Sequence, residues 1–331
     1  MMTELNRRIA CQWIAASLSA TATPVAVRAQ TGYPSKTVTV VSPFAPGGLN
    51  DMCARAVAKG LQQAFAQPVI VENRPGANTL LAMGQVARSA PDGHLLVTCT
   101  DTNMVYLPTI APKQQFSLEN DFAPITLLCA VPTLLIVRPG LQLNSVADLI
   151  AAGKAQPGKL TFASAGVASV AHIAGELFKW QAGVNMVHIP YRGAILGLTD
   201  VISGHVDLMF ADLGTASELI TAGRARAVGI TSLRRSSKFP DVPTFDETGL
   251  KDFEARLWVG VAARAGTPVE IIRRLNKEIV ASMHDPSVGG VIANLGAEIV
   301  TNSPDDFEAM IVRERTRFAP ILRAAGIKLD G

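Results

Sequence analysis

Residues 38–51 read Val38-Thr39-Val40-Val41-Ser42-Pro43-Phe44-Ala45-Pro46-Gly47-Gly48-Leu49-Asn50-Asp51. An apolar, β-branched run stops there at two prolines and two glycines, and the apolar positions that follow, up to Leu61, recur at helical spacing. This order predicts a strand, a glycine turn and a helix. The turn and the helix start leave backbone N–H groups uncovered at the positive end of the helix dipole, which favours binding of an anion. The alternative is a plain strand-to-helix turn with Asp51 in the first helical turn.

The following residues continue the alternation of strands and helices. Short strands are expected at 68–73 and 94–100, with a helix between them from Thr79 to Arg88. Such a rhythm predicts an α/β fold with a mainly parallel sheet flanked by helices. The polar end of the third strand, at Thr100, is then expected beside the glycine turn, at the carboxyl edge where open α/β sheets bind ligands.

A second strand, small-residue turn and helix begin at Leu160 and repeat the chemistry of the first. The turn is Ser164-Ala165-Gly166-Val167-Ala168-Ser169, and we expect its free N–H groups and the hydroxyls of Ser164 and Ser169 to face outward. Two extended runs that bend at Pro132, and a returning run at 257–263, predict two crossings between two lobes. Two anion-binding turns in one chain indicate a single ligand held from both lobes.

Composition and the first residues indicate an exported globular protein. The 331 residues are 48% hydrophobic and 17% charged, which is enough for two compact domains and excludes disorder. Arg7-Arg8, a mostly apolar stretch and Val27-Arg28-Ala29 predict a signal peptide over residues 1–29, cleaved after Ala29. Without residues 1–29 the formal net charge falls from +3 to +1, and a nearly neutral chain lacks the basic surface that binds nucleic acid.

Three cysteines remain after residue 29: Cys53, Cys99 and Cys129. An odd number in an exported chain allows one disulfide with one free thiol, or three buried thiols. Cys53 and Cys99 are the candidate pair, and buried, inert thiols are the default. Without a Cys-x-x-Cys motif, and without histidines at metal-ligand spacing, we expect no metal and no cofactor.

Motifs for catalysis are absent from the sequence: it contains no Gly-x-Ser-x-Gly, no His-Glu-x-x-His and no complete Gly-x-x-x-x-Gly-Lys-Ser/Thr, because Leu160 follows the partial match at Gly153 to Lys159. Four single residues have two interpretations each. His172 either faces the ligand or is a structural hydrogen-bond partner, and Asp212 either contacts the ligand or caps the next helix. Tyr191 and Arg192 either line the entrance to the site or lie on the surface.

Several motifs in order resemble one known family. Pro43 to Asp51 is similar to the Pro-Phe-x-Pro-Gly-Gly-x-x-Asp signature of the tripartite tricarboxylate transporter solute-binding proteins, the Bug or TctC family. Further motifs are Glu72-Asn73-Arg74-Pro75-Gly76-Ala77, Pro190-Tyr191-Arg192-Gly193 and Gly266-Thr267-Pro268, so that the resemblance spans Tyr33 to Lys328. It implies the two-lobed fold of type II periplasmic binding proteins. We expect residues 33–131 and 256–331 in one lobe and residues 132–255 in the other, with hinges near residues 131 and 256.

The resemblance also implies a function: a periplasmic receptor, not an enzyme, that binds a small organic carboxylate and delivers it to membrane permease subunits. A periplasmic sensor that presents its ligand to a membrane receptor, or a periplasmic enzyme, are the alternatives, and we expect a monomer. The chain departs from the family at Asn78, which follows Gly76-Ala77, and in the less glycine-rich middle of residues 164–169. The residues expected to line the ligand site between the lobes are Phe44, Ala45, Pro46, Gly47, Gly48, Asp51, Gly76, Asn78, Thr100, Ser164, Ala165, Gly166, Ser169, His172, Tyr191 and Asp212.

Overall fold

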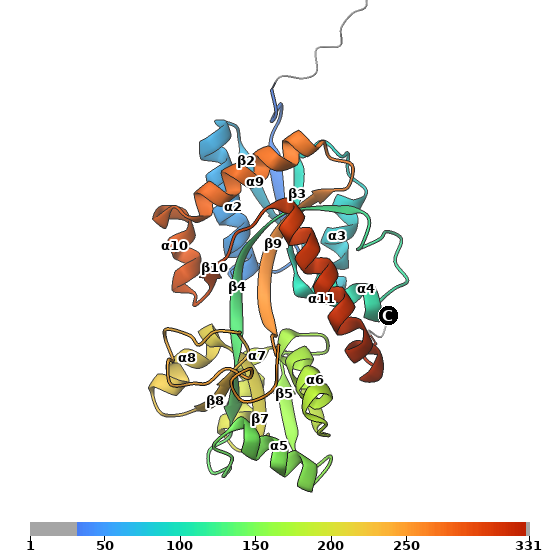
Figure 1. The fold of residues 1–331 in the computed structure, drawn as a ribbon. Coiled ribbons are helices and arrows are strands. Elements are labelled where there is room, and N and C mark those ends of the chain that lie inside the picture. The colour runs from blue at the N-terminus through green and yellow to red at the C-terminus, as the bar shows by residue number, and fades with distance from the viewer. Residues whose placement is uncertain (1–31, 329–331) are drawn as a thin grey trace, which may run out of the picture. The chain divides into compact units, whose positions relative to one another are not determined.

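The computed structural model describes residues 32–328. The predicted signal peptide over residues 1–29, its cleavage position after Ala29, and Cys11 all lie outside the described residues. From Lys36 onward the chain forms one compact unit, drawn in Figure 1. Within the described part, no helix combines the length and the apolar character needed to cross a bilayer.

Ten strands are connected in the order β2-β1-β3-β9-β4-β7-β5-β6, with β8 and β10 also paired to β4. They form a first sheet (upper half of Figure 1) and a second sheet (lower half), and β4 belongs to both. The strands of the first sheet are β1 (Val38–Ser42), β2 (Val69–Asn73), β3 (Leu95–Thr100), β4 (Phe122–Val137), β9 (Arg256–Arg264) and β10 (Glu298–Ile299). The second sheet adds β5 (Thr161–Ser164), β6 (Val187–Pro190), β7 (Leu208–Asp212) and β8 (Arg226–Ile230).

Each sheet contains a parallel part and an antiparallel part. β2, β1 and β3 are parallel to one another, as are β6, β5 and β7. The pairs that involve β4, and the pair β3–β9, are antiparallel. The sheets are therefore mixed rather than mainly parallel as predicted, because the two strands that connect them run in opposite directions.

β4 changes its sheet between Pro132 and Thr133. Up to Pro132 it pairs with β9, and from Thr133 onward it pairs with β7. Proline has no N–H to donate, so it fits the point at which one ladder ends. The Thr133 and Thr231 hydroxyls lie 3.0 Å apart, and Thr231 Oγ1 donates to the carbonyl of Ala255, one residue before β9 begins. The segments that join the two sheets are thus tied together at the crossing.

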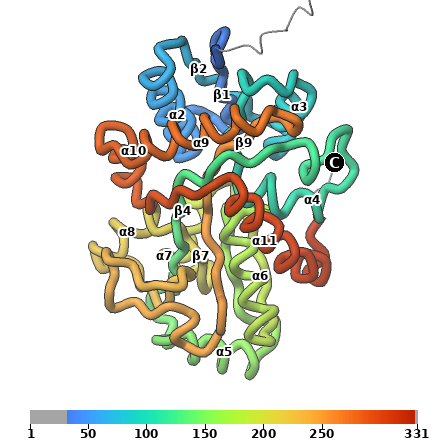
Figure 2. Tube along the Cα trace, turned by 45° about the horizontal axis from the view of Figure 1, so that its top comes forward, coloured from blue at the N-terminus to red at the C-terminus, as the bar shows by residue number. Residues whose placement is uncertain are grey.

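Helices cover both sheets, and α9 and α10 lie beside α2 in both views (Figures 1 and 2). Ser145 and Ser303 cap α5 and α11 through their side chains, as serine commonly does at the start of a helix. The helices are α2 (Leu49–Phe65), α3 (Leu80–Ala87), α4 (Leu107–Ile110), α5 (Val146–Ala155), α6 (Val170–Ala182), α7 (Ala194–Ile202), α8 (Leu213–Thr221), α9 (Val269–Met283), α10 (Pro286–Asn294) and α11 (Pro304–Ala324). Two irregular turns, η1 (Ala77–Thr79) and η2 (Thr102–Tyr106), precede α3 and α4.

The three cysteines of the described chain are free and fully buried. Cys53 on α2 faces Cys129 on β4, with the two Sγ atoms 3.6 Å apart. The candidate pairing of Cys53 with Cys99 is therefore wrong, because β3 places Cys99 opposite Gly260 of β9. Burial raises the pKa of the Cys99 thiol.

Candidate functional site

The first loop, residues 43–51, joins β1 to α2 and is closed by the carboxylate of Asp51. Asp51 Oδ2 accepts hydrogen bonds from Gly47 N and from Arg55 Nε, both at 2.9 Å. Asp51 Oδ1 accepts from Asn73 Nδ2 at 2.8 Å, and the same amide donates to the carbonyl of Phe44. The side chain of Asp51 is 2% exposed. Asp51 therefore organises the loop from inside, as an anion held at the helix start.

The electrostatics of Asp51 agree with this arrangement. Burial alone would raise the pKa of its carboxyl, but the hydrogen bonds from Arg55, Gly47 and Asn73 hold that pKa below its usual value. The carboxylate is thus ionised at neutral pH.

Other N–H groups of the first loop remain open. Those of Ala45, Gly48 and Leu49 have no acceptor among the described residues. Ala45 and Gly48 are exposed and Leu49 is half-buried. A Cβ added at Gly47 or Gly48 would meet nothing within 4 Å, so the space beside these glycines is open. The loop can donate backbone hydrogen bonds to an anion, as the sequence predicts.

The second loop, residues 164–169, joins β5 to α6, and its hydroxyls point inward. Ser164 is fully buried, and its Oγ lies 2.6 Å from His188 Nε2 and accepts from Gly166 N at 3.1 Å. Ser169 Oγ donates to the carbonyl of Gly166 at 2.7 Å and accepts from His172 N, which caps α6. The expectation that both hydroxyls face outward is therefore wrong, because the loop uses them to satisfy its own backbone.

His172 holds the second loop from the helix side. Its Nδ1 accepts a hydrogen bond from the backbone N–H of Ala168 at 3.1 Å, so Nδ1 carries no proton and the ring is neutral. The ring centroid lies 3.7 Å from that of His188, with the two rings nearly parallel, and the Phe162 ring lies beside both, 4.9 Å from His188 and 6.2 Å from His172. Of the two interpretations of His172, this geometry matches the structural hydrogen-bond partner.

Both imidazoles resist protonation. Burial lowers the pKa of His172 to about 3, and the neighbouring His188 and Lys179 add to the shift. Burial and Lys179 lower the pKa of His188 to about 4. The second loop is thus supported by neutral rings at any pH above about 4.

The N–H groups of Ala165 and Val167 have no acceptor in the described part of the chain. Ala165 is half-buried and Val167 is 47% exposed. As in the first loop, the unused donors precede a helix that follows the carboxyl end of a parallel strand. The two loops therefore present the same kind of group, although different side chains support them.

The predicted residues after β2 and β3 lie in different environments. Ala77, Asn78 and Thr79 all have positive φ, a conformation that costs energy for residues other than glycine, and Asn78 is exposed. Gly76 has a φ of 134°, and a Cβ there would approach Leu81 to 2.6 Å. Thr100 is 2% exposed, and its hydroxyl has no partner among residues 32–328. Thr100 is therefore buried at the strand end rather than open to solvent.

Tyr191 and Asp212 each form a hydrogen bond with a side chain on a helix, α7 and α8 respectively. The Tyr191 hydroxyl donates to Asp200 at 2.6 Å, and burial together with this carboxylate raises the pKa of Tyr191 to about 12. Asp212 stands at the N-cap position of α8 but accepts from the hydroxyl of Thr215 rather than from a backbone N–H. The neighbouring Arg192 is exposed.

Two residues that support the loops were missed in the sequence. Asn73 ends β2, and its polar side chain at the carboxyl end of a strand was a usable signal. His188 lies on β6 opposite Phe162 of β5. That register joins segments that the sequence does not connect, so no pattern in the sequence indicates the contact between His188 and Ser164.

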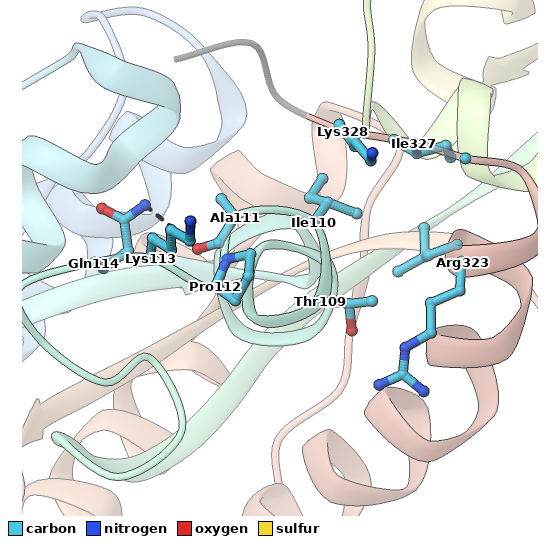
Figure 3. A pocket seen from close by; sticks show the side chains of 11 residues that line it. Thr109, Ile110, Ala111, Pro112, Lys113, Gln114, Arg323, Ile327 and Lys328 are labelled. Carbon is cyan, nitrogen blue, oxygen red and sulfur yellow. Dashed lines mark hydrogen bonds between the residues drawn. The ribbon is translucent and has the colours of Figure 1, made fainter.

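A cavity apart from the two loops contains none of the predicted ligand residues. Among residues 32–328, no group of three or more His, Cys, Asp or Glu side chains is placed to hold a metal ion. A cavity of about 720 Å³ lies between residues 109–114 and the end of α11 (Figure 3). Its walls include Ile110 and Pro112 on one side and Ile327 on the other.

Comparison with known proteins yields one consistent family. The family described as Tripartite tricarboxylate transporter family receptor matches residues 53–327. Protein BugT from Bordetella pertussis is 35% identical over 298 residues, which cover 90% of this chain and 91% of BugT. The solved structure of R. palustris Rpa4515 with adipate is 31% identical, covers 89% of this chain and 99% of its own, and has a TM-score of 0.75. MatC from Rhodopseudomonas palustris with bound malate is 29% identical, covers 88% and 100% of the two chains, and has a TM-score of 0.72.

Proposed function

Because the chain belongs to the tripartite tricarboxylate transporter receptor family, we propose that it is a periplasmic receptor that binds a small organic carboxylate between the first and the second loop. It passes this ligand to the membrane permease subunits of a tripartite transporter and performs no catalysis. The related proteins solved with adipate and with malate support a carboxylate as the ligand. The signal peptide proposed for residues 1–29 would direct the chain to the periplasm.

The observation that carries the proposal is the set of unused backbone donors in the two loops. Ala45, Gly48 and Leu49 in the first loop, and Ala165 and Val167 in the second, offer N–H groups at the starts of α2 and α6. A carboxylate can accept several such bonds, and the two helix dipoles favour its negative charge. In this arrangement Asp51, Ser164, Ser169 and His172 support the loops, and the backbone contacts the ligand.

We propose that the two lobes consist of residues 33–131 with 256–331, and of residues 132–255. The change of β4 from one sheet to the other after Pro132 supports this division, and so does the start of β9 at Arg256. A ligand that accepts bonds from both loops binds a closed arrangement more tightly than an open one. That difference in affinity is what would drive closure about the two crossings.

A thermal-shift screen tests the function. Adipate, malate, other organic acids, amino acids and neutral sugars are added to the purified protein in turn. A ligand at 100 times its dissociation constant raises the free energy of unfolding by about 2.7 kcal/mol, which gives a clear increase in Tm. Stabilisation by one class of carboxylate supports the proposal. Stabilisation by sugars alone, or consumption of an acid without stabilisation, contradicts it.

Gly48→Val tests the site. Gly48 has φ −83° and ψ 172°, which valine adopts without strain, and its surroundings are open. The added side chain would cover the N–H groups beside it, so we expect an affinity loss on the order of 100-fold with an unchanged Tm of the free protein. Gly290→Val in α10, also in open space, is the matched control and should bind normally. Equal affinity of the two variants would refute the assignment.

A further inference from the structure

Cys53 and Cys129 are brought together from distant parts of the chain. Cys53 lies on α2, five residues after Gly48, and Cys129 lies on β4 just before the crossing at Pro132. Both side chains are fully buried, and their Sγ atoms are 3.6 Å apart. A disulfide bond is about 2.05 Å long, so side-chain rotation and a small shift must close a gap of about 1.5 Å.

We propose that Cys53 and Cys129 form a disulfide when the exported chain folds, and that Cys99 stays a free thiol. In this reaction the two thiols lose two protons and two electrons to a protein disulfide of the oxidising compartment. The Cys53–Cys129 bond forms, and the oxidant is released as its dithiol. The compartment follows from the proposed export, whereas the pairing rests on the distance between the two thiols alone.

The burial of Cys53 and Cys129 determines when their disulfide can form. The attacking species in thiol–disulfide exchange is a thiolate. In the folded dithiol form, the contact with Cys129 and burial raise the pKa of Cys53, so the thiolate is scarce and no oxidant reaches it. The bond therefore forms during folding, before Cys53 and Cys129 are buried. A chain already folded with both thiols reduced should resist the same oxidant.

The disulfide would connect two parts with a role in the proposed site. α2 carries the first loop at its start, and β4 is one of the two strands that join the sheets. A covalent bond between them holds the first loop's helix against the crossing strand. Because the bond also closes a long loop in the unfolded chain, we expect the oxidised protein to melt about 5–10 °C above the reduced one.

Peptide mapping tests the pairing. The chain from residue 30 onward, which carries Cys53, Cys99 and Cys129, is denatured and refolded with oxidised glutathione, its free thiols are alkylated, and it is digested without reduction. We expect one linked pair of peptides that carries Cys53 and Cys129, and an alkylated Cys99. The same oxidant added to the folded, reduced protein should leave all three thiols alkylated after denaturation. Three alkylated thiols after oxidative refolding, or a link that involves Cys99, would overturn the proposal.

Two variants serve as controls. Cys99→Ala should retain both the linked peptides and the Tm difference between the oxidised and the reduced protein. Cys129→Ala should lose both and leave Cys53 alkylated, and pairing of Cys53 with Cys99 in this variant would contradict the assigned geometry. Mapping needs no ligand, so its result is independent of the thermal-shift screen that tests the receptor function.

Discussion

The first and the second loop present the same backbone donors but are supported by opposite kinds of chemistry. In the first loop an ionised carboxylate, Asp51, accepts from Gly47 N, Asn73 and Arg55. In the second loop neutral groups do this work: the hydroxyls of Ser164 and Ser169 and the rings of two histidines. The comparison shows that one backbone arrangement can be built with or without a fixed charge. The two halves of the site should therefore respond differently to mutation and to acid.

Removal of Asp51 should have the largest effect. In Asp51→Ala the N–H of Gly47 and the amide of Asn73 lose their acceptor, so we expect the free energy of unfolding to fall by about 3 kcal/mol. Carboxylate affinity should fall on the order of 100-fold as the loop loses its shape. Urea unfolding and calorimetric titration measure the two quantities.

The charge of Asp51 makes this prediction sharp. Loss of an anion beside the N–H groups would by itself favour a carboxylate ligand, so tighter binding in Asp51→Ala would contradict the supporting role. Arg55→Gln is the matched control. The Arg55 side chain is 53% exposed, so Arg55→Gln should lower the free energy of unfolding by only about 0.5 kcal/mol.

In the second loop, His172→Phe should have a smaller effect. Phenylalanine keeps an aromatic ring next to His188 but leaves the N–H of Ala168 without an acceptor, at a cost of about 2 kcal/mol. His172→Asn places an amide oxygen near the position of Nδ1 and should restore most of the stability and of the ligand affinity. If Asn and Phe are equally damaging, the hydrogen bond to Ala168 is not what the loop requires.

The smallest expected difference between the loops is in how their contribution to stability depends on pH. The unfolded chain takes up protons at its histidines below pH 6.5, whereas folded His172 and His188 do so only near pH 3 and pH 4. Their contribution to stability is thus complete above pH 6.5 and is lost as the pH falls toward 4. Between pH 6 and pH 5, the free energy of unfolding should fall by about 1 kcal/mol for each of the two rings.

Urea unfolding of the wild type and of His172→Asn at pH 7, 6 and 5 measures this loss. Two charged side chains lie near His172. Glu176 Oε1 is 3.8 Å from His172 Nε2, and the same oxygen forms an ion pair with Lys179. The variant should show the shallower dependence on pH. Asp51, whose pKa is lowered from 3.8, contributes its own loss only at lower pH. If the free energy of unfolding depends equally on pH in the wild type and in His172→Asn, the buried histidine is not the cause of the loss in acid.

Elements with a strong local pattern were predictable, and those without one were not. The glycine turn after Ser42 and the serine caps of α5 and α11 are each indicated by a few neighbouring residues in the sequence. The structure contains all three. α10 (Pro286–Asn294) was not predicted because Gly289 and Gly290 weaken its helical pattern. η2 and α4, which follow the polar end of β3, were also missed, because Pro108 and the β-branched residues around it weaken the helical pattern.

At the site, sequence located the loops but not the direction of their side chains. Ser164 looks like an outward donor in the sequence, yet it turns inward because His188, on a neighbouring strand, completes its hydrogen bonds. Asp51 similarly depends on Asn73 at the end of β2. Such contacts follow from strand register and helix docking, which a single sequence does not contain. The binding role of the predicted residues stays a prediction.

The pairing of β9 also determines when the protein can fold. β9 pairs residues 259–263 with residues 96–100 of β3, and residues 256–264 with the first part of β4. The first sheet therefore stays open, with β3 and β4 each lacking a partner along one edge, until the chain has been synthesised through residue 264. Contacts so distant along the chain slow folding. In the export proposed above, this late pairing would keep the first sheet incomplete until β9 has been synthesised.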